Sequence, residues 1–159
     1  MKTKDIIKSQ FRASLAMLQQ AIKKCPGPMW EDDRYKNPFW HIVYHTLIYA
    51  HFYLFPTAGD FIPWEKHIDG FQGFEPLAEG QKPYKKEELL EYLDLCLEQV
   101  EIQVNALNLE AESGFNWLPF NKLELQFYNI RHIMQHTGEL CERLGAHGEI
   151  EVDWIGKKD

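Results

Sequence analysis

Two histidines near the C-terminal end of the chain have the spacing of a metal-binding pair. His132 and His136 lie four residues apart in the segment RHIMQHTGEL. On a helix, such side chains project from the same face about one turn apart, so two imidazoles can share one ion. HExxH helices bind zinc with this geometry, but Ile133 stands where that motif has its glutamate, so the metalloprotease interpretation fails. An HxxxH pair alone is a weak signal, because surface pairs with this spacing are common.

A second group of histidines lies in NPFWHIVYHTLIYAHFYLFP, residues 37–56, one of the most apolar segments of the chain. The segment contains His41, His45 and His51. A buried imidazole costs free energy unless its ring nitrogens find partners, so these histidines need an explanation. His45 lies two turns inside the expected helix, on a stripe that should face the axis of a helix bundle. That stripe consists of Ile42, His45, Tyr49 and Phe52.

Together the two segments predict a metal site made of three histidines. In an antiparallel bundle, His45 from one helix can meet the pair His132 and His136 from another. Three neutral imidazoles leave at least one coordination position open for water or substrate, as in catalytic rather than structural zinc sites. A metal ion would also satisfy a ring nitrogen that an apolar core cannot. The competing interpretation is that these are ordinary core or surface histidines.

The other histidines are not expected to be ligands. His41 lies near the start of the expected helix, where it can hydrogen-bond a neighbour. His51 is expected at the boundary of the core, and His67 and His147 in solvent. His41 and Tyr49 are the candidates for orienting a nucleophile or moving a proton, and nothing in the sequence chooses between them.

Four helical segments must position these side chains. Apolar residues recur every three or four positions in residues 7–25 and 86–108, which predicts two amphipathic helices. Residues 37–55 are apolar all round and should form the most buried helix, with Asn37 as its N-cap and Pro38 at its first position. Asn121 with Glu124 resembles a capping box for the last helix, which should stop at Gly145. The sequence therefore predicts an all-α helix bundle with a long crossover between its second and third helices.

The crossover, residues 57–84, is too long for an ordinary connection and is expected to be functional or to cover the bundle. It contains Phe61, Trp64, Phe71 and Phe74, which are too many large apolar groups to leave in water. The loop either forms an apolar wall beside the metal, which would favour an apolar ligand, or covers the bundle or builds a dimer contact. Both alternatives are open.

Composition limits the classes of partner. The 159 residues are enough for a single domain, 1–159, with its own core. The 17 basic and 24 acidic residues give a net charge of −7, which disfavours a nucleic-acid partner. No apolar run is long enough to span a bilayer, and the N-terminal residues lack the apolar core of a signal peptide. Cys25, Cys96 and Cys141 are odd in number and widely spaced, which predicts reduced thiols in a cytoplasmic protein.

The order of these motifs resembles that of a known superfamily. The run FWHIVYHTLIYA, then YKKEELLEYL after a long aromatic loop, then RHIMQHTGELCERLG and a terminal DWIGK are similar to the DinB-like superfamily over almost the whole chain. The resemblance implies an up-down-down-up four-helix bundle, often a homodimer, that holds a divalent metal ion with three histidines. It places the first ligand on His45, in VYHTL, and the other two on His132 and His136, in RHIMQH.

The resemblance also implies classes of activity. Some members of the superfamily are transferases or isomerases that depend on a small thiol such as bacillithiol or mycothiol. The leading hypothesis is therefore a metal-dependent enzyme, a small-thiol-dependent S-transferase or a hydrolase acting on a small-molecule substrate, with zinc or nickel as the ion. The alternative is a metal- or small-ligand-binding module without turnover, such as a sensor or carrier.

Overall fold

The computed structural model describes residues 2–71 and 74–159, and in these residues the chain is all-helical. No β-strand forms within them, and the single isolated bridge joins Glu112 to Asn121. The elements are α1 (Thr3–Lys24), α2 (Gly27–Trp30), α3 (Phe39–Phe52), the 3₁₀ helix η1 (Ala58–Asp60), α4 (Lys86–Ala106) and α5 (Lys122–Gly148). The all-α class expected from the sequence is thus confirmed.

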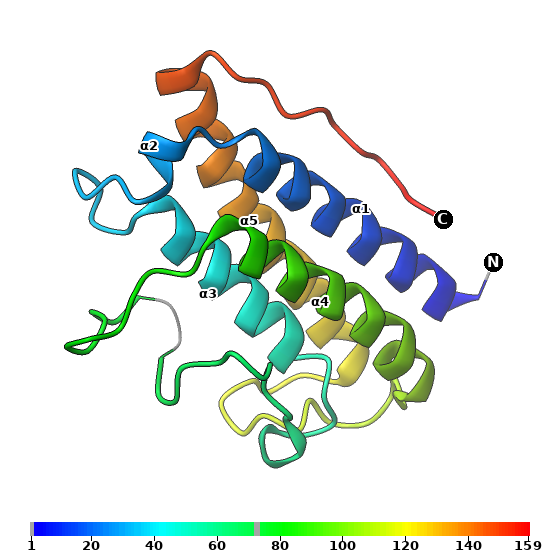
Figure 1. The fold of residues 1–159 in the computed structure, drawn as a ribbon. Helices are drawn as coiled ribbons and strands as arrows, with labels where there is room; N and C mark the ends of the chain where they lie inside the picture. Colours follow the sequence, from blue (N-terminus) through cyan, green and yellow to red (C-terminus); the bar gives the residue numbers. More distant parts are fainter. Residues whose placement is uncertain (1, 72–73) are drawn as a thin grey trace.

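The four long helices pack in pairs around one core (Figure 1). α1 contacts α4 and α5, and α3 contacts the same two helices from the other side. In Figure 1, α3 and α4 run in one direction, whereas α1 and α5 run in the opposite direction. The apolar stripes of all four helices supply the core. Its fully buried members include Phe11, Leu15, Leu18, Tyr44, Leu47, Leu89, Leu93, Ile133, Leu140 and Leu144.

The helix ends follow local capping chemistry, with two departures from expectation. Asn121 caps α5 as predicted, since its side-chain oxygen accepts a hydrogen bond from the Glu124 backbone N–H at 2.9 Å. Pro38, and not Asn37, is the N-cap of α3. α5 continues through Gly145 to Gly148, because Glu149 takes the left-handed conformation (φ 52°) and closes the helix there.

The crossover between α3 and α4 contributes part of the core. Trp64 and Phe71 are only 4% and 3% exposed. The Trp64 ring stacks on Tyr92 of α4, with centroids 4.6 Å apart, and Phe71 stacks on Tyr44 of α3 at 5.3 Å. Trp64 and Phe71 of the crossover are therefore buried against α4 and α3.

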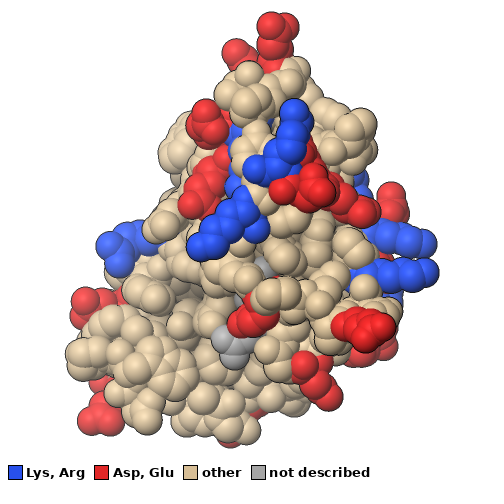
Figure 2. Space-filling view, turned by 90° about the vertical axis from the view of Figure 1, so that its left-hand side faces the viewer, with Lys and Arg blue, Asp and Glu red and all other residues tan. Residues whose placement is uncertain are grey.

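In the part of the chain that the structure describes, no helix combines the length and apolarity needed to cross a bilayer. On the face shown in Figure 2, Lys and Arg side chains lie among Asp and Glu side chains. Charges of both signs are therefore mixed on this face.

Candidate metal centre

The residues of α3 that remain accessible to solvent all lie on one side of the helix. Of its 14 residues, all described, 11 are buried, and the three that remain partly exposed are His45, Tyr49 and Phe52. These residues are spaced by four and three positions, so they lie on one side of the helix. The stripe was expected to face the bundle axis, but it lies at the edge of the core. A ligand can therefore reach it from solvent.

α5 supplies the second half of the site. His132 and His136 are one turn apart on the helix, and His136 is 7% exposed. Buried apolar residues on the neighbouring positions, Ile133 and Leu140, hold this face of α5 against the rest of the molecule. Because α3 and α5 pack directly on each other, the two histidines of α5 face His45.

The three imidazoles converge on one point. Nε2 of His132 lies 3.2 Å from Nε2 of His45 and 3.2 Å from Nε2 of His136. One nitrogen from each ring lies within 4.8 Å of those of the other two. The structure thus brings together the three histidines that the sequence analysis proposed as ligands, in an arrangement that could hold a metal ion.

Burial keeps the central imidazole uncharged. The pKa of His132 is lowered from 6.5 to about 3, mainly because burial disfavours the charged ring and also because His136 and His45 lie beside it. Its Nδ1 is buried and has no hydrogen-bond partner in the part of the chain that the structure describes. A neutral imidazole is the form that ligates a metal ion.

Glu139 fixes the orientation of one candidate ligand. Its Oε2 lies 2.7 Å from Nδ1 of His136. A carboxylate only accepts hydrogen bonds, so Nδ1 carries the proton and Nε2 presents its lone pair to the other two histidines. A carboxylate behind a ligating histidine is a recurrent part of metal sites. Glu139 was not predicted from the sequence, although its position three residues after His136 on one helix was a usable signal.

Two aromatic rings border the three histidines. The Phe74 ring lies on the His45 ring, with centroids 3.9 Å apart and planes 15° from parallel, and it meets His136 at 5.9 Å. On another side, the Tyr49 ring is 4.9 Å from His45 and 5.7 Å from His132. Phe74 also lines a pocket of about 440 Å³ together with His136, Glu139 and Arg143. The site therefore has an apolar border and an adjoining space of ligand size.

The remaining histidines lie elsewhere. The ring of His41 packs on Trp40 at 3.9 Å and on Phe71 at 5.6 Å, and neither ring nitrogen has a hydrogen-bond partner among the described residues. His51 was expected at the boundary of the core but is only 2% exposed. His67 was expected in solvent, yet it is partly buried and hydrogen-bonds to the Tyr44 hydroxyl through Nδ1. The expectations for His51 and His67 were wrong.

The cysteines take no part in the site. Cys25 and Cys96 are buried and Cys141 is partly buried, and all three are free thiols. Burial raises the pKa of Cys25 to about 11, so its thiol is protonated at neutral pH.

The chain matches no protein-family model, no curated protein and no solved structure. The geometry of the three histidines is therefore the basis for any functional conclusion.

Proposed function

We propose that the chain binds one divalent metal ion through Nε2 of His45, His132 and His136. The observation that supports this is the pair of Nε2 separations of 3.2 Å on either side of His132. Nitrogen ligands about 2.0–2.1 Å from a tetrahedral zinc ion lie roughly 3.3–3.4 Å apart, which is close to these separations. Three imidazole ligands suit zinc or nickel and leave at least one position for another ligand.

We further propose that the site catalyses transfer of a small thiol to an electrophilic substrate, or hydrolysis. A divalent ion, when bound, supplies Lewis-acid chemistry that makes a thiol or a water nucleophilic at neutral pH. Glu139 holds the His136 ring in the required tautomer. Phe74 shields His45 from bulk water and offers an apolar surface to a substrate.

Tyr49 is the better placed of the two residues considered for proton movement. It lies against both His45 and His132, whereas the His41 ring packs on Trp40. Burial, with a contribution from the charge of Glu75, raises the pKa of Tyr49. Its hydroxyl is therefore protonated at neutral pH and can donate a hydrogen bond or a proton to a group at the site. The role of His41 stays a prediction.

We also propose a helix topology and an oligomeric state for the protein. Helix directions in Figure 1 support an up-down-down-up four-helix bundle of the DinB-like kind, with the crossover following α3. We propose that the protein is a cytoplasmic homodimer without a nucleic-acid partner, in keeping with its net charge of −7.

A non-catalytic metal- or ligand-binding module is the second candidate. The stacking of Phe74 on His45 supports it, because an aromatic border beside an open metal position also suits a carrier or sensor. Both candidates require the metal and differ only in turnover.

The experiment that separates them is a screen of the zinc- and nickel-loaded protein with bacillithiol and mycothiol against a panel of apolar electrophiles. For the enzyme we expect conjugates to accumulate, and Tyr49→Phe to slow their formation at least tenfold without loss of metal. Tight ligand binding with no conjugate or hydrolysis product for any member of the panel would refute the enzyme and favour the module.

A further inference from the structure

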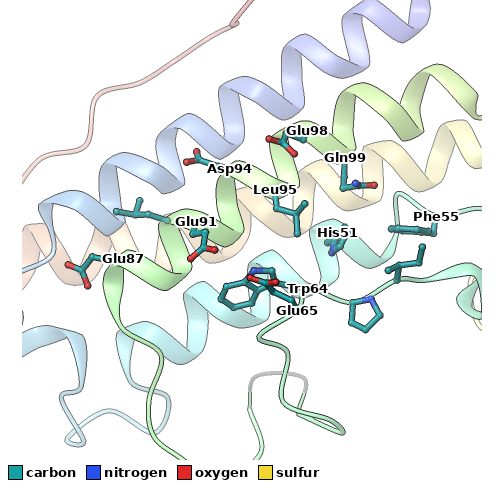
Figure 3. A pocket seen from close by; sticks show the side chains of 13 residues that line it. His51, Phe55, Trp64, Glu65, Glu87, Glu91, Asp94, Leu95, Glu98 and Gln99 are labelled. Carbon is teal, nitrogen blue, oxygen red and sulfur yellow. The ribbon is translucent and has the colours of Figure 1, made fainter.

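A second pocket lies on another side of α3, between α4 and the segment 62–65 of the crossover (Figure 3). It has a volume of about 810 Å³, within the range of small-molecule sites. Phe55, Trp64, Leu90 and Leu95 give it an apolar lining. His45 and His51 are six residues apart on α3, which places them about 120° apart around the helix. The pocket is therefore distinct from the three-histidine site.

Carboxylates border this pocket on two sides. Glu87, Glu91, Asp94 and Glu98 follow one another at spacings of four, three and four residues, so they share one face of α4. Glu65 contributes a fifth carboxylate from the crossover. Within the described residues, the one ion pair of this group joins Glu91 to Lys66 at 2.5 Å. The pocket thus carries excess negative charge beside an apolar surface.

His51 gives this pocket a buried polar group that lacks a partner. The residue is 2% exposed and lines the pocket between Leu95 and Phe55 in the view of Figure 3. Its Nδ1 lies 3.2 Å from the hydroxyl of Tyr92, and its Nε2 has no hydrogen-bond partner among the described residues. An unsatisfied buried nitrogen is costly, so its retention calls for a ligand atom or a water.

The Tyr92 contact is compatible with a tautomer of His51 that carries its proton on the free Nε2. Tyr92 is fully buried, and in the part of the chain that the structure describes its hydroxyl has His51 as its hydrogen-bond partner. When the Tyr92 hydroxyl donates to Nδ1, the neutral imidazole carries its proton on Nε2. In that tautomer His51 offers an N–H donor to the pocket.

We propose that this pocket binds a small organic cation of amphipathic shape. Its amine or guanidinium group lies among the carboxylates of α4 and Glu65, its apolar body lies on Trp64 and Leu95, and an acceptor atom at its far end receives the Nε2–H of His51. Charge complementarity selects a cation over an anion, and the apolar lining selects an organic body over a metal ion.

Three matched probes test this proposal in titration calorimetry at low salt. They are 2-(4-methoxyphenyl)ethylamine, its 4-methyl analogue, which lacks the acceptor, and 3-(4-methoxyphenyl)propanoate, which reverses the charge. We expect the methoxy amine to bind, the methyl amine to bind about twofold to tenfold more weakly, and the propanoate to show no binding. Equal affinity for the amine and the propanoate, or no binding of any probe, would overturn the proposal.

Variants locate the bound amine. Glu87→Gln with Asp94→Asn should weaken binding about threefold to tenfold, whereas Glu31→Gln, which removes an exposed charge outside the pocket, should leave it unchanged. His51→Leu should abolish the preference for methoxy over methyl. If His51→Leu does not fold, the test uses the wild-type protein alone. The methoxy amine should bind more tightly than the methyl amine, and its titration should change the chemical shift of the Trp64 indole N–H. Loss of binding in His132→Ala would show that the amine ligates the metal instead, and would refute this site.

Discussion

Nε2 of His132 lies 3.2 Å from Nε2 of His45, although the two residues are 87 positions apart in the sequence. The helices that carry them meet along their length, and the contact falls on the one partly exposed side of α3. Two neutral rings share one Nε2–H proton at this distance, and His132 has a second Nε2 neighbour, that of His136, at the same 3.2 Å. A metal ion satisfies all three nitrogens at once.

Glu139→Gln should weaken metal binding without unfolding the protein. A glutamine can turn its amide NH₂ toward Nδ1 of His136 and permit the tautomer whose Nε2 is protonated and cannot ligate. We expect the affinity for zinc to fall about tenfold to 100-fold, measured by competition with a chromogenic chelator. Glu142→Gln, which removes a carboxylate one turn further along α5, is the matched control. Equal affinities of the two variants would exclude a role of Glu139 in orienting His136.

Aromatic residues of the crossover should fall into two groups on substitution. Phe74 is 40% exposed and stacks on His45, so Phe74→Ala should reduce the affinity for an apolar ligand at the metal site with little change in the melting temperature. Trp64→Ala and Phe71→Ala remove side chains that are only 4% and 3% exposed, so each should lower the free energy of unfolding by about 3–5 kcal/mol. Denaturant unfolding and ligand titration of the three variants measure this. A Phe74→Ala variant as unstable as Trp64→Ala would assign all three residues to the core alone.

His51 should make the protein less stable in acid. Burial lowers the pKa of His51 from 6.5 to about 4, so the folded state binds the proton more weakly than the unfolded state. Its contribution to stability is complete above pH 6.5 and is lost as the pH falls toward 4, on the order of 2–3 kcal/mol in all. Tyr92 is the titratable group that contacts the ring, and the carboxylates of the second pocket line the same pocket as His51.

The measurement is the free energy of unfolding of wild type and His51→Leu between pH 4 and 7. As the pH falls, we expect the free energy of unfolding of the wild type to decrease relative to that of His51→Leu. A difference that is independent of pH would show that His51 does not titrate in this range.

The candidate ligands could be predicted from the sequence because their spacing along the helices indicates which side chains can lie close together. The spacing of His132 and His136 and the depth of His45 in its helix need only helical periodicity and a bundle. The depth of His51 could not be predicted, because residues 37–55 are apolar on every side and no polar face indicates the direction of solvent. The end of α5 was missed for a local reason. Gly145 was expected to stop the helix, but Glu149 takes that role in a conformation that a non-glycine residue seldom adopts.

The measurement that bears most directly on the metal centre is the metal content of untagged protein after loading with zinc or nickel and gel filtration. Elemental analysis should find close to one ion per chain for the wild type and for His147→Ala, which removes a histidine from the last turn of α5 outside the site. The His132→Ala variant should retain almost no metal ion after loading at the same metal concentration. A wild-type protein that holds no ion after loading, or a His132→Ala variant that holds as much as His147→Ala, would contradict the three-histidine site.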